Sequence, residues 1–195
     1  MYKYKDLGLS NTKEMFAKAN KEGYAVPAFN FNNMEMALAI VEACAEMGSP
    51  VILQCSKGAL NYMGADVVPL LAKAAVDRAR NMGSDIPVAL HLDHGPDIET
   101  VKTCIEAGFS SVMFDGSHYG IEENVEKTKE IVALAHSKGI SVEAEVGSIG
   151  GEEDGVVGAG EVADPAECKR IADLGIDFLA AGIGNIHGKY PENWA

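Results

Sequence analysis

Two histidines and an aspartate lie within four consecutive positions of the chain, in the run HLDHG at residues 91–95. The apolar residues before it predict a strand over Val88–Asp93, and alternation places His91 and Asp93 on one face of that strand. His94 begins the loop that follows. An imidazole beside a carboxylate suits metal-assisted acid–base chemistry, in which His94 binds Zn²⁺ and Asp93 removes a substrate proton. Taken alone, His94 would be explained better as a hydrogen-bonded histidine and Asp93 as the N-cap of a helix. Two histidines and one aspartate together make these structural explanations less fitting.

Acidic residues form a second group at the ends of two later strands. Glu143 and Glu145 alternate in the predicted strand Ser141–Val146, so their side chains share one face. An unpaired inward charge is costly, which makes Glu145 a candidate metal ligand or the partner of a buried cation. For Glu143, a pair with a lysine or arginine of the barrel lining fits equally. Asp115 follows the strand predicted at Ser111–Phe114.

A glycine-rich acidic segment, GSIGGEEDG at residues 147–155, runs on to about Glu161. It is long for a connection between a strand and a helix, and such loops are either functional or disordered. Its glycines would let it close over a site and deliver Glu152 or Glu153 as a mobile acid or base. Taken without its neighbours, the segment reads as a solvated acidic turn.

The run GIGNIHGKY at residues 182–190 holds the last candidates. His187 could supply a second imidazole ligand, and glycines on both sides allow the backbone to approach a phosphate closely. His118 has no clear assignment. His136 lies near a helix C-terminus, where we expect it to interact with the helix dipole.

Short apolar runs alternate with amphipathic segments along the whole chain, and together they predict the elements that position these residues. The expected strands are Ala25–Asn30, Val51–Cys55, Val88–Asp93, Ser111–Phe114, Ser141–Val146 and Phe178–Ala181. The expected helices are Thr12–Lys21, Met34–Met47, Ala65–Met82, Ile98–Ala107, Glu122–Lys138 and Pro165–Leu174. Asn11 and Glu14 match a capping box for the first helix. Glycines close several helices just before the next strand.

This strand–helix repeat predicts parallel strands in either an open doubly wound sheet or a closed barrel. Candidate chemical groups end strand after strand, and only in a barrel do those ends converge on one mouth. The sequence therefore predicts an α/β fold of the TIM (β/α)₈ barrel type. A complete barrel needs eight units and about 250 residues. We expect residues 1–195 to form one barrel domain with about the first six units, and strands seven and eight to belong to a longer protein.

Bulk composition excludes several classes of function. The chain has 195 residues and a net charge of −13, which argues against nucleic acid or anionic membranes as partners. No apolar stretch approaches the ~18 residues that span a bilayer, and the N-terminus lacks a signal-peptide core. The four cysteines form no CxxC pair and suit reduced thiols in a cytoplasmic protein. A phosphorylated substrate stays compatible, because a metal ion and helix-start N–H groups can form a local anion site.

The chain resembles the class II fructose-1,6-bisphosphate aldolases across essentially its whole length. The shared runs are PAFN (27–30), QCSKG (54–58), HLDHG (91–95), SVMFD (111–115), VEAE (142–145) with its GGEE loop, and GNIHG (184–188). Tagatose-bisphosphate aldolases share nearly all of them, so both sugars stay open.

The resemblance implies a role for each matched residue. His94 and His187 match zinc ligands, and Asp93 matches the group that removes the C4 hydroxyl proton. Glu145 and Asp115 match acidic positions that hold the metal in an alternative site, bind a second cation or orient ligands. The remaining matches are Glu153 or, less well, Glu152 as the loop acid, Asn30 and Ser56 as substrate contacts, and Gly188 as part of a phosphate cradle.

The activity implied is the reversible zinc-dependent cleavage of fructose 1,6-bisphosphate to dihydroxyacetone phosphate and glyceraldehyde 3-phosphate, a step of glycolysis and gluconeogenesis. A second divalent or monovalent cation and a homodimer or homotetramer also belong to this expectation. The family's third zinc histidine comes from a later strand, so this chain alone is expected to hold a damaged or inactive site. The alternatives are the same chemistry on tagatose 1,6-bisphosphate, or a non-catalytic barrel fragment that acts as a binding or assembly module.

Overall fold

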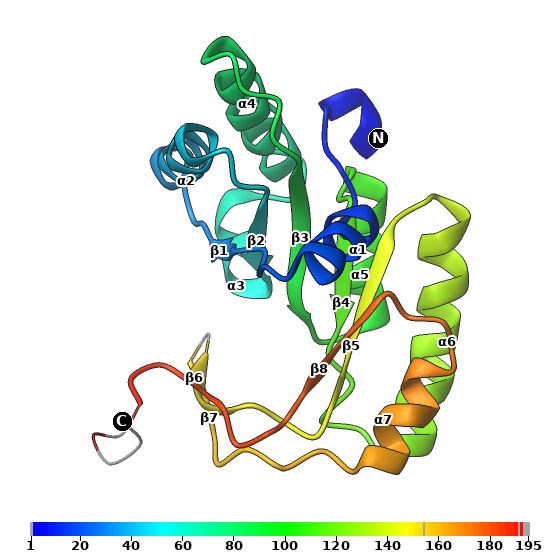
Figure 1. The fold of residues 1–195 in the computed structure, drawn as a ribbon. Coiled ribbons are helices and arrows are strands. Elements are labelled where there is room, and N and C mark those ends of the chain that lie inside the picture. Colours follow the sequence, from blue (N-terminus) through cyan, green and yellow to red (C-terminus); the bar gives the residue numbers. More distant parts are fainter. Residues whose placement is uncertain (1, 154, 191, 193–195) are drawn as a thin grey trace.

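The computed structural model describes residues 2–153, 155–190 and 192, and its main element is a parallel six-stranded sheet (Figure 1). The strand order is β1-β2-β3-β4-β5-β8, so successive strands are neighbours throughout. Their bounds are β1 Ala28–Asn30, β2 Val51–Ser56, β3 Val88–Gly95, β4 Ser111–Phe114, β5 Ser141–Val146 and β8 Phe178–Ala181. The sheet curls into a half-barrel, which confirms the predicted class of fold.

Helices connect consecutive strands and pack around the sheet (Figure 1). Their bounds are η1 Tyr4–Leu7 (a 3₁₀ turn), α1 Thr12–Glu22, α2 Met34–Met47, α3 Lys57–Met63, α4 Val68–Asn81, α5 Ile98–Ala107, α6 Ile121–Ser137 and α7 Pro165–Ala172. The sequence did not predict η1 or α3. The hydroxyl of Ser56 starts α3 by accepting a hydrogen bond from Ala59 N at 3.2 Å.

Side chains alternate along the strands, so one face of the sheet is apolar and the other carries the polar candidate residues. Leu53, Leu90 and Leu92 are fully buried in the main core, on the face that the helices cover. Ile52 and Ala89 point to the opposite face, where Met15 of α1 packs against them. Helix α1 therefore covers the N-terminal part of the inner face with apolar side chains. The polar side chains of that face lie towards the C-terminal ends of the strands.

Helix α1 is fixed by polar contacts different from those that the sequence suggested. The Thr12 hydroxyl donates to Ser141 Oγ at 2.7 Å, at the beginning of β5. The expected capping box is wrong: Asn11 makes no side-chain cap, and its Nδ2 donates to Gly139 O at 3.0 Å instead. The side chain of Asn11 thus ties the helix to the turn before β5, and this bond takes the place of the expected cap.

Strands β1 and β8 are the two edges of the main sheet, and the structure shows no pairing between them within the described residues. All three residues of β1 are exposed, including Phe29 with 45% of its surface accessible. The described part of the chain contains no helix that is long and apolar enough to cross a membrane. The expected completion of the barrel by two further strands stays a prediction.

The glycine-rich acidic segment forms strands, whereas the sequence suggested a loop. Strand β6 (Gly150–Glu153) pairs antiparallel with β7 (Val156–Gly158) and parallel with β9 (Ile186–His187). This small sheet lies beyond the C-terminal ends of the main strands (Figure 1). It brings the segment that carries His187 over the mouth of the half-barrel.

Candidate active site

The end of β3 has an irregular backbone that turns two neighbouring side chains in different directions. The ladder between β3 and β4 shifts register between Leu92 and Gly95. Within this bulge His94 has a φ of 43°, and it is the one non-glycine residue with positive φ in the described part of the chain. Such a conformation costs on the order of 1–3 kcal/mol and persists where surrounding contacts impose it, often at functional sites.

Asp93 turns towards strands β1 and β2, where two amides hold its carboxylate. Asn30 Nδ2 donates to Oδ2 and Gln54 Nε2 donates to Oδ1, each at 2.7 Å. The side chain is buried, and these two bonds fix the orientation of its carboxylate. Sequence reasoning did not assign Gln54. Its signal was available, because a polar residue in the middle of an apolar strand faces inward beside the candidate base.

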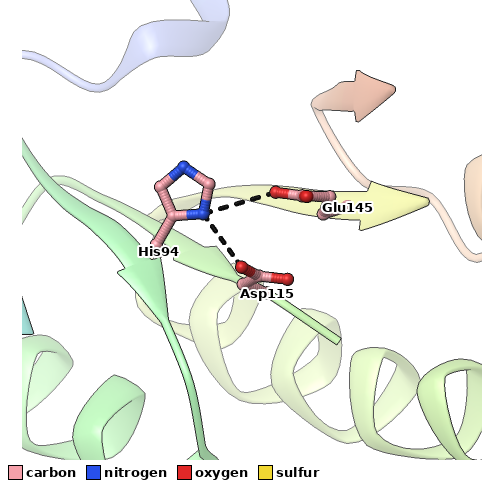
Figure 2. Close-up of side chains that lie close together, drawn as sticks. All are labelled: His94, Asp115 and Glu145. Carbon is pink, nitrogen blue, oxygen red and sulfur yellow. Dashed lines mark hydrogen bonds and ion pairs between the residues drawn. The ribbon is translucent and has the colours of Figure 1, made fainter. Parts of the chain in front are cut away.

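His94 turns the other way and meets two carboxylates (Figure 2). Its Nδ1 lies 2.9 Å from Asp115 Oδ2 and 3.4 Å from Glu145 Oε2. Glu145 is 1% exposed, and its Oε2 accepts no hydrogen bond from any described residue. The three ligand atoms lie within 4.8 Å of one another. Ligands of a tetrahedral Zn²⁺ with bonds of about 2.0 Å stand about 3.3 Å apart, so this donor set fits such an ion.

The electrostatics of the cluster favour a bound cation. Burial, together with the neighbouring Asp115, raises the pKa of Glu145 to about 7. Burial also pushes the pKa of Asp115 upward, but hydrogen bonds from His94 and Ser117 outweigh it and leave that pKa below its ordinary value. A divalent cation would relieve the repulsion between the two carboxylates and favour the ionised form of Glu145.

We expect the cation-free protein to lose stability as the pH rises from about 4.5, the ordinary pKa of glutamate, to about 7, the raised pKa of Glu145. In that window the folded state holds a proton that the unfolded state has released, so unfolding becomes easier with each pH step. Asp115, with its lowered pKa, contributes only below about pH 4. Urea unfolding at pH 5 and pH 8 measures the effect.

The matched control for this pH dependence is Glu145→Gln, which cannot ionise. The parent should lose more free energy of unfolding between pH 5 and pH 8 than the variant does. Equal losses in the two proteins would show that Glu145 does not titrate with a raised pKa. With saturating Zn²⁺, the parent's free energy of unfolding should depend less on pH near pH 8, because the ion competes with the proton for Glu145.

A second histidine reaches the cluster from the small sheet. The rings of His94 and His187 have centroids 5.1 Å apart in an edge-to-face arrangement. Gly151 of β6 pairs with His187, and a Cβ at that glycine would lie 2.0 Å from His187 O. The position therefore requires glycine, both for this close approach and for its φ of 91°.

A cleft of about 670 Å³ opens between the half-barrel and the small sheet. Among the residues predicted for the site, those lining it are Ser56, His94, Asp115, Glu145 and His187. The cleft lining of described residues does not include Asp93 and Asn30, which form the adjacent hydrogen-bonded group on β1–β3. His118 is exposed at the rim, beside Tyr119, with ring centroids 3.9 Å apart and ring planes tilted by 41°.

The remaining predicted site residues lie away from the cluster or beyond description. Glu152 is exposed on β6, and the side chain of Glu153 falls outside the described residues. Gly188 is exposed, and no atom in the described part of the chain lies within 4 Å of the position that its Cβ would take. The structure therefore does not bring Glu152 or Gly188 against the other predicted residues, and their roles stay predictions.

Two histidines have partners that sequence reasoning did not foresee. His91 Nδ1 is bonded to Ser111 Oγ at 2.8 Å, and His91 Nε2 lies 3.1 Å from Glu143 Oε2. The partner of Glu143 is thus a histidine rather than the lysine or arginine considered. His136 Nε2 is bonded to Asp177 Oδ2 at 2.8 Å, so it has a specific acceptor beyond the helix dipole.

A parallel half-barrel whose strand ends carry an imidazole, two carboxylates and a fixed aspartate defines an α/β-barrel protein with a candidate metal centre. The family model for class II fructose-bisphosphate aldolases matches residues 10–195. This chain belongs to that family.

Individual relatives agree with the family match. The fructose-bisphosphate aldolase of Streptococcus pyogenes serotype M1 is 53% identical over 182 residues, which are 93% of this chain and 61% of the relative. A Coccidioides immitis structure assigned as a fructose-1,6-bisphosphate aldolase matches with a TM-score of 0.80 and 35% identity. The match covers 92% of this chain and 63% of that structure's chain. The structure of the YdjI aldolase of Escherichia coli K12 matches with a TM-score of 0.77 and 30% identity, and the match covers 94% of this chain and 64% of that one. The chain thus spans less than two thirds of the length of these relatives.

Proposed function

We propose that the protein to which this chain belongs cleaves fructose 1,6-bisphosphate reversibly to dihydroxyacetone phosphate and glyceraldehyde 3-phosphate, as an enzyme of glycolysis. The observation that carries the proposal is the cluster of His94, Asp115 and Glu145, with its ligand atoms within 4.8 Å, beside an aspartate held by two amides. The names of the curated relatives favour fructose over tagatose bisphosphate as the sugar.

The proposed metal is Zn²⁺, held by His94 and His187 with Glu145 and Asp115 as further or alternative ligands. The distances from His94 Nδ1 to the two carboxylates support this donor set, as does the raised pKa of Glu145. When bound, the ion acts as a Lewis acid that stabilises negative charge on the oxygens of the ketose. The two carboxylates would also suit a second divalent or a monovalent cation.

Asp93 is the proposed base of the reaction. It removes the proton of the C4 hydroxyl, the C3–C4 bond breaks, and glyceraldehyde 3-phosphate leaves with a new carbonyl at C4. The electron pair of the broken bond stays on the three-carbon fragment, which must then be protonated at C3. Asn30 and Gln54 hold both carboxylate oxygens of Asp93 and so direct it without a competing positive charge.

The proton donor in that last step is proposed to be Glu153, or Glu152, carried by the β6–β7 hairpin. Ser56 at the cleft supports a polar contact to substrate, and Asn30 and Gly188 are proposed as the other substrate-binding positions. A hairpin beside the cleft is suited to closing over a phosphorylated ketose and excluding water.

We also propose that the whole protein is a single barrel domain, assembles as a homodimer or homotetramer, and works in the cytoplasm. The open edges of β1 and β8 support further strands in the barrel. All four cysteines are free thiols, and three of them are buried, which suits a reducing compartment.

The decisive experiment measures fructose 1,6-bisphosphate cleavage and zinc content in the natural protein before and after treatment with a chelator. Activity should fall to background on chelation and return on adding Zn²⁺, because the negative charge that forms on the substrate needs a Lewis acid. Tagatose 1,6-bisphosphate, which differs only at C4, is the matched substrate control and should be cleaved more slowly.

Each other result would correct a specific part of the proposal. Full activity after complete metal removal would exclude the metal mechanism and the ligand roles of His94 and His187. Faster cleavage of the tagatose sugar would keep the mechanism and change the substrate. A metal-loaded protein that cleaves neither sugar would support the non-catalytic alternative.

A further inference from the structure

Asn124, which lies in the first turn of α6, is a buried amide close to the candidate metal centre. It is 3% exposed, and its backbone N–H donates to Gly120 O at 3.0 Å as the helix begins. A buried amide group is expensive unless its donors and acceptors are satisfied. The partners of this side chain therefore show which segments it holds.

The amide connects α6 with the end of β5. Asn124 Nδ2 donates to the backbone carbonyl of Glu145 at 3.0 Å. On the other side, Thr128 donates its hydroxyl to Asn124 Oδ1 at 3.0 Å, which fixes the orientation of the amide from within the same helix. The amide is thus locked by its own helix and reaches the backbone of a residue in the cluster.

The same amide also limits the position of the loop after β4. A Cβ added to Gly116 would lie 2.2 Å from Asn124 Oδ1 and 2.5 Å from its Cγ, so the loop backbone rests directly on the amide. Gly116 follows Asp115, whose carboxylate is held in that loop by the Ser117 N–H at 3.0 Å and the Ser117 hydroxyl at 2.6 Å.

Asn124 therefore touches the backbone beside one carboxylate of the cluster and the backbone of the other. We propose that Asn124 is a positioning residue that sets the separation between the carboxylates of Asp115 and Glu145, and through it the affinity of the cluster for a divalent cation. This inference rests on the proposed cation site. Groups that orient metal ligands commonly change affinity when removed, although they never contact the ion.

The test compares Asn124→Ala with Thr12→Val in the natural protein. Thr12 is fully buried, and its hydroxyl donates to Ser141, which begins β5, whereas Glu145 lies near the end of that strand. The Thr12 variant therefore loses a comparable hydrogen bond far from the cluster. Zn²⁺ affinity is measured by competition with a chelator, and the visible spectrum of bound Co²⁺ reports ligand geometry. Asn124→Ala should weaken Zn²⁺ binding by about 10- to 100-fold and alter the Co²⁺ spectrum, whereas Thr12→Val should change neither.

Gly116→Ala provides a second route if Asn124→Ala fails to fold. The added methyl group would push the loop that carries Asp115 away from an intact Asn124, and it should weaken Zn²⁺ binding in the same way. A folded Asn124→Ala protein with parental affinity and Co²⁺ spectrum would overturn the positioning role alone. If Asp115→Ala and Glu145→Ala also leave Zn²⁺ affinity unchanged, the cation site and the positioning role are both wrong.

Discussion

Replacing Asp93 by alanine is expected to lower the turnover number for fructose 1,6-bisphosphate cleavage by a factor of about 10³, the usual range for losing a general base. Zinc content should stay near that of the parent, because Asp93 faces Asn30 and Gln54 while the cluster around His94 lies on the other side of β3. Steady-state kinetics and metal analysis on the same preparations of the natural protein measure both quantities.

Ser110→Ala is the matched control for the Asp93 variant. Ser110 is fully buried, and its hydroxyl exchanges hydrogen bonds with the backbone of Leu90, which lies on β3 like Asp93 but away from the cleft. This variant should lose stability but keep its turnover number. Near-parental turnover in Asp93→Ala would remove Asp93 from the mechanism, and a parallel loss of zinc would give it a structural role at the metal centre instead.

Replacing Gly151 by alanine is expected to lower turnover by about 10²-fold and to weaken Zn²⁺ binding, since displacements of about 1 Å in an active site have effects of this size. The new methyl group would lie 2.0 Å from His187 O, so β6 and β9 could no longer pair as they do. His187 would then move away from His94. Turnover and Zn²⁺ affinity of the natural protein and the variant test this expectation.

Gly155→Ala separates the steric effect from the conformational one. Gly155 has a φ of 81°, similar to the 91° of Gly151, but no atom of the described residues lies within 4 Å of its potential Cβ. Both variants therefore carry the strain of a left-handed alanine, roughly 1–2 kcal/mol, and only Gly151→Ala adds the backbone clash. Equal losses of activity in the two variants would show that hairpin strain, and not the position of His187, controls the reaction.

The strands and helices with strong periodicity could be predicted from the sequence almost to the residue. Met34–Met47, Ile98–Ala107 and Ser141–Val146 have the bounds that their patterns indicated. Each is flanked by a glycine or a polar cap and carries a regular apolar face, so local preference and burial agree. The same logic predicted that the strand ends would meet at one mouth.

Short elements without such a pattern were missed. Helix α3 has only seven residues and follows a Ser-Lys-Gly run that reads as a polar turn. The β6–β7 hairpin is rich in glycine and glutamate, residues that are uncommon in strands, and it forms because β9 pairs alongside it. A partner from 30 or more residues away is not visible in a local pattern, so this segment was expected to be a loop.

In the site, the types of residue were predictable and their contacts were not. The contact of His91 on β3 with Glu143 on β5 reaches across β4, and sequence spacing does not reveal a contact between strands that are not neighbours. The register shift between β3 and β4 and the positive φ of His94 are likewise backbone features that sequence spacing does not reveal. Gln54 and Asn124 were overlooked for the same reason, because each acts on a group that is distant in sequence.

The left-handed backbone at His94 has an evolutionary consequence. Because one irregular residue turns Asp93 towards one side of the mouth and His94 towards the other, an insertion or deletion between them would misplace both groups at once. We therefore expect Asp93 and His94 to be kept or lost together within the family. New sugar preferences within this family should arise in the loops after the other strands, where a change in shape leaves the reacting groups in place.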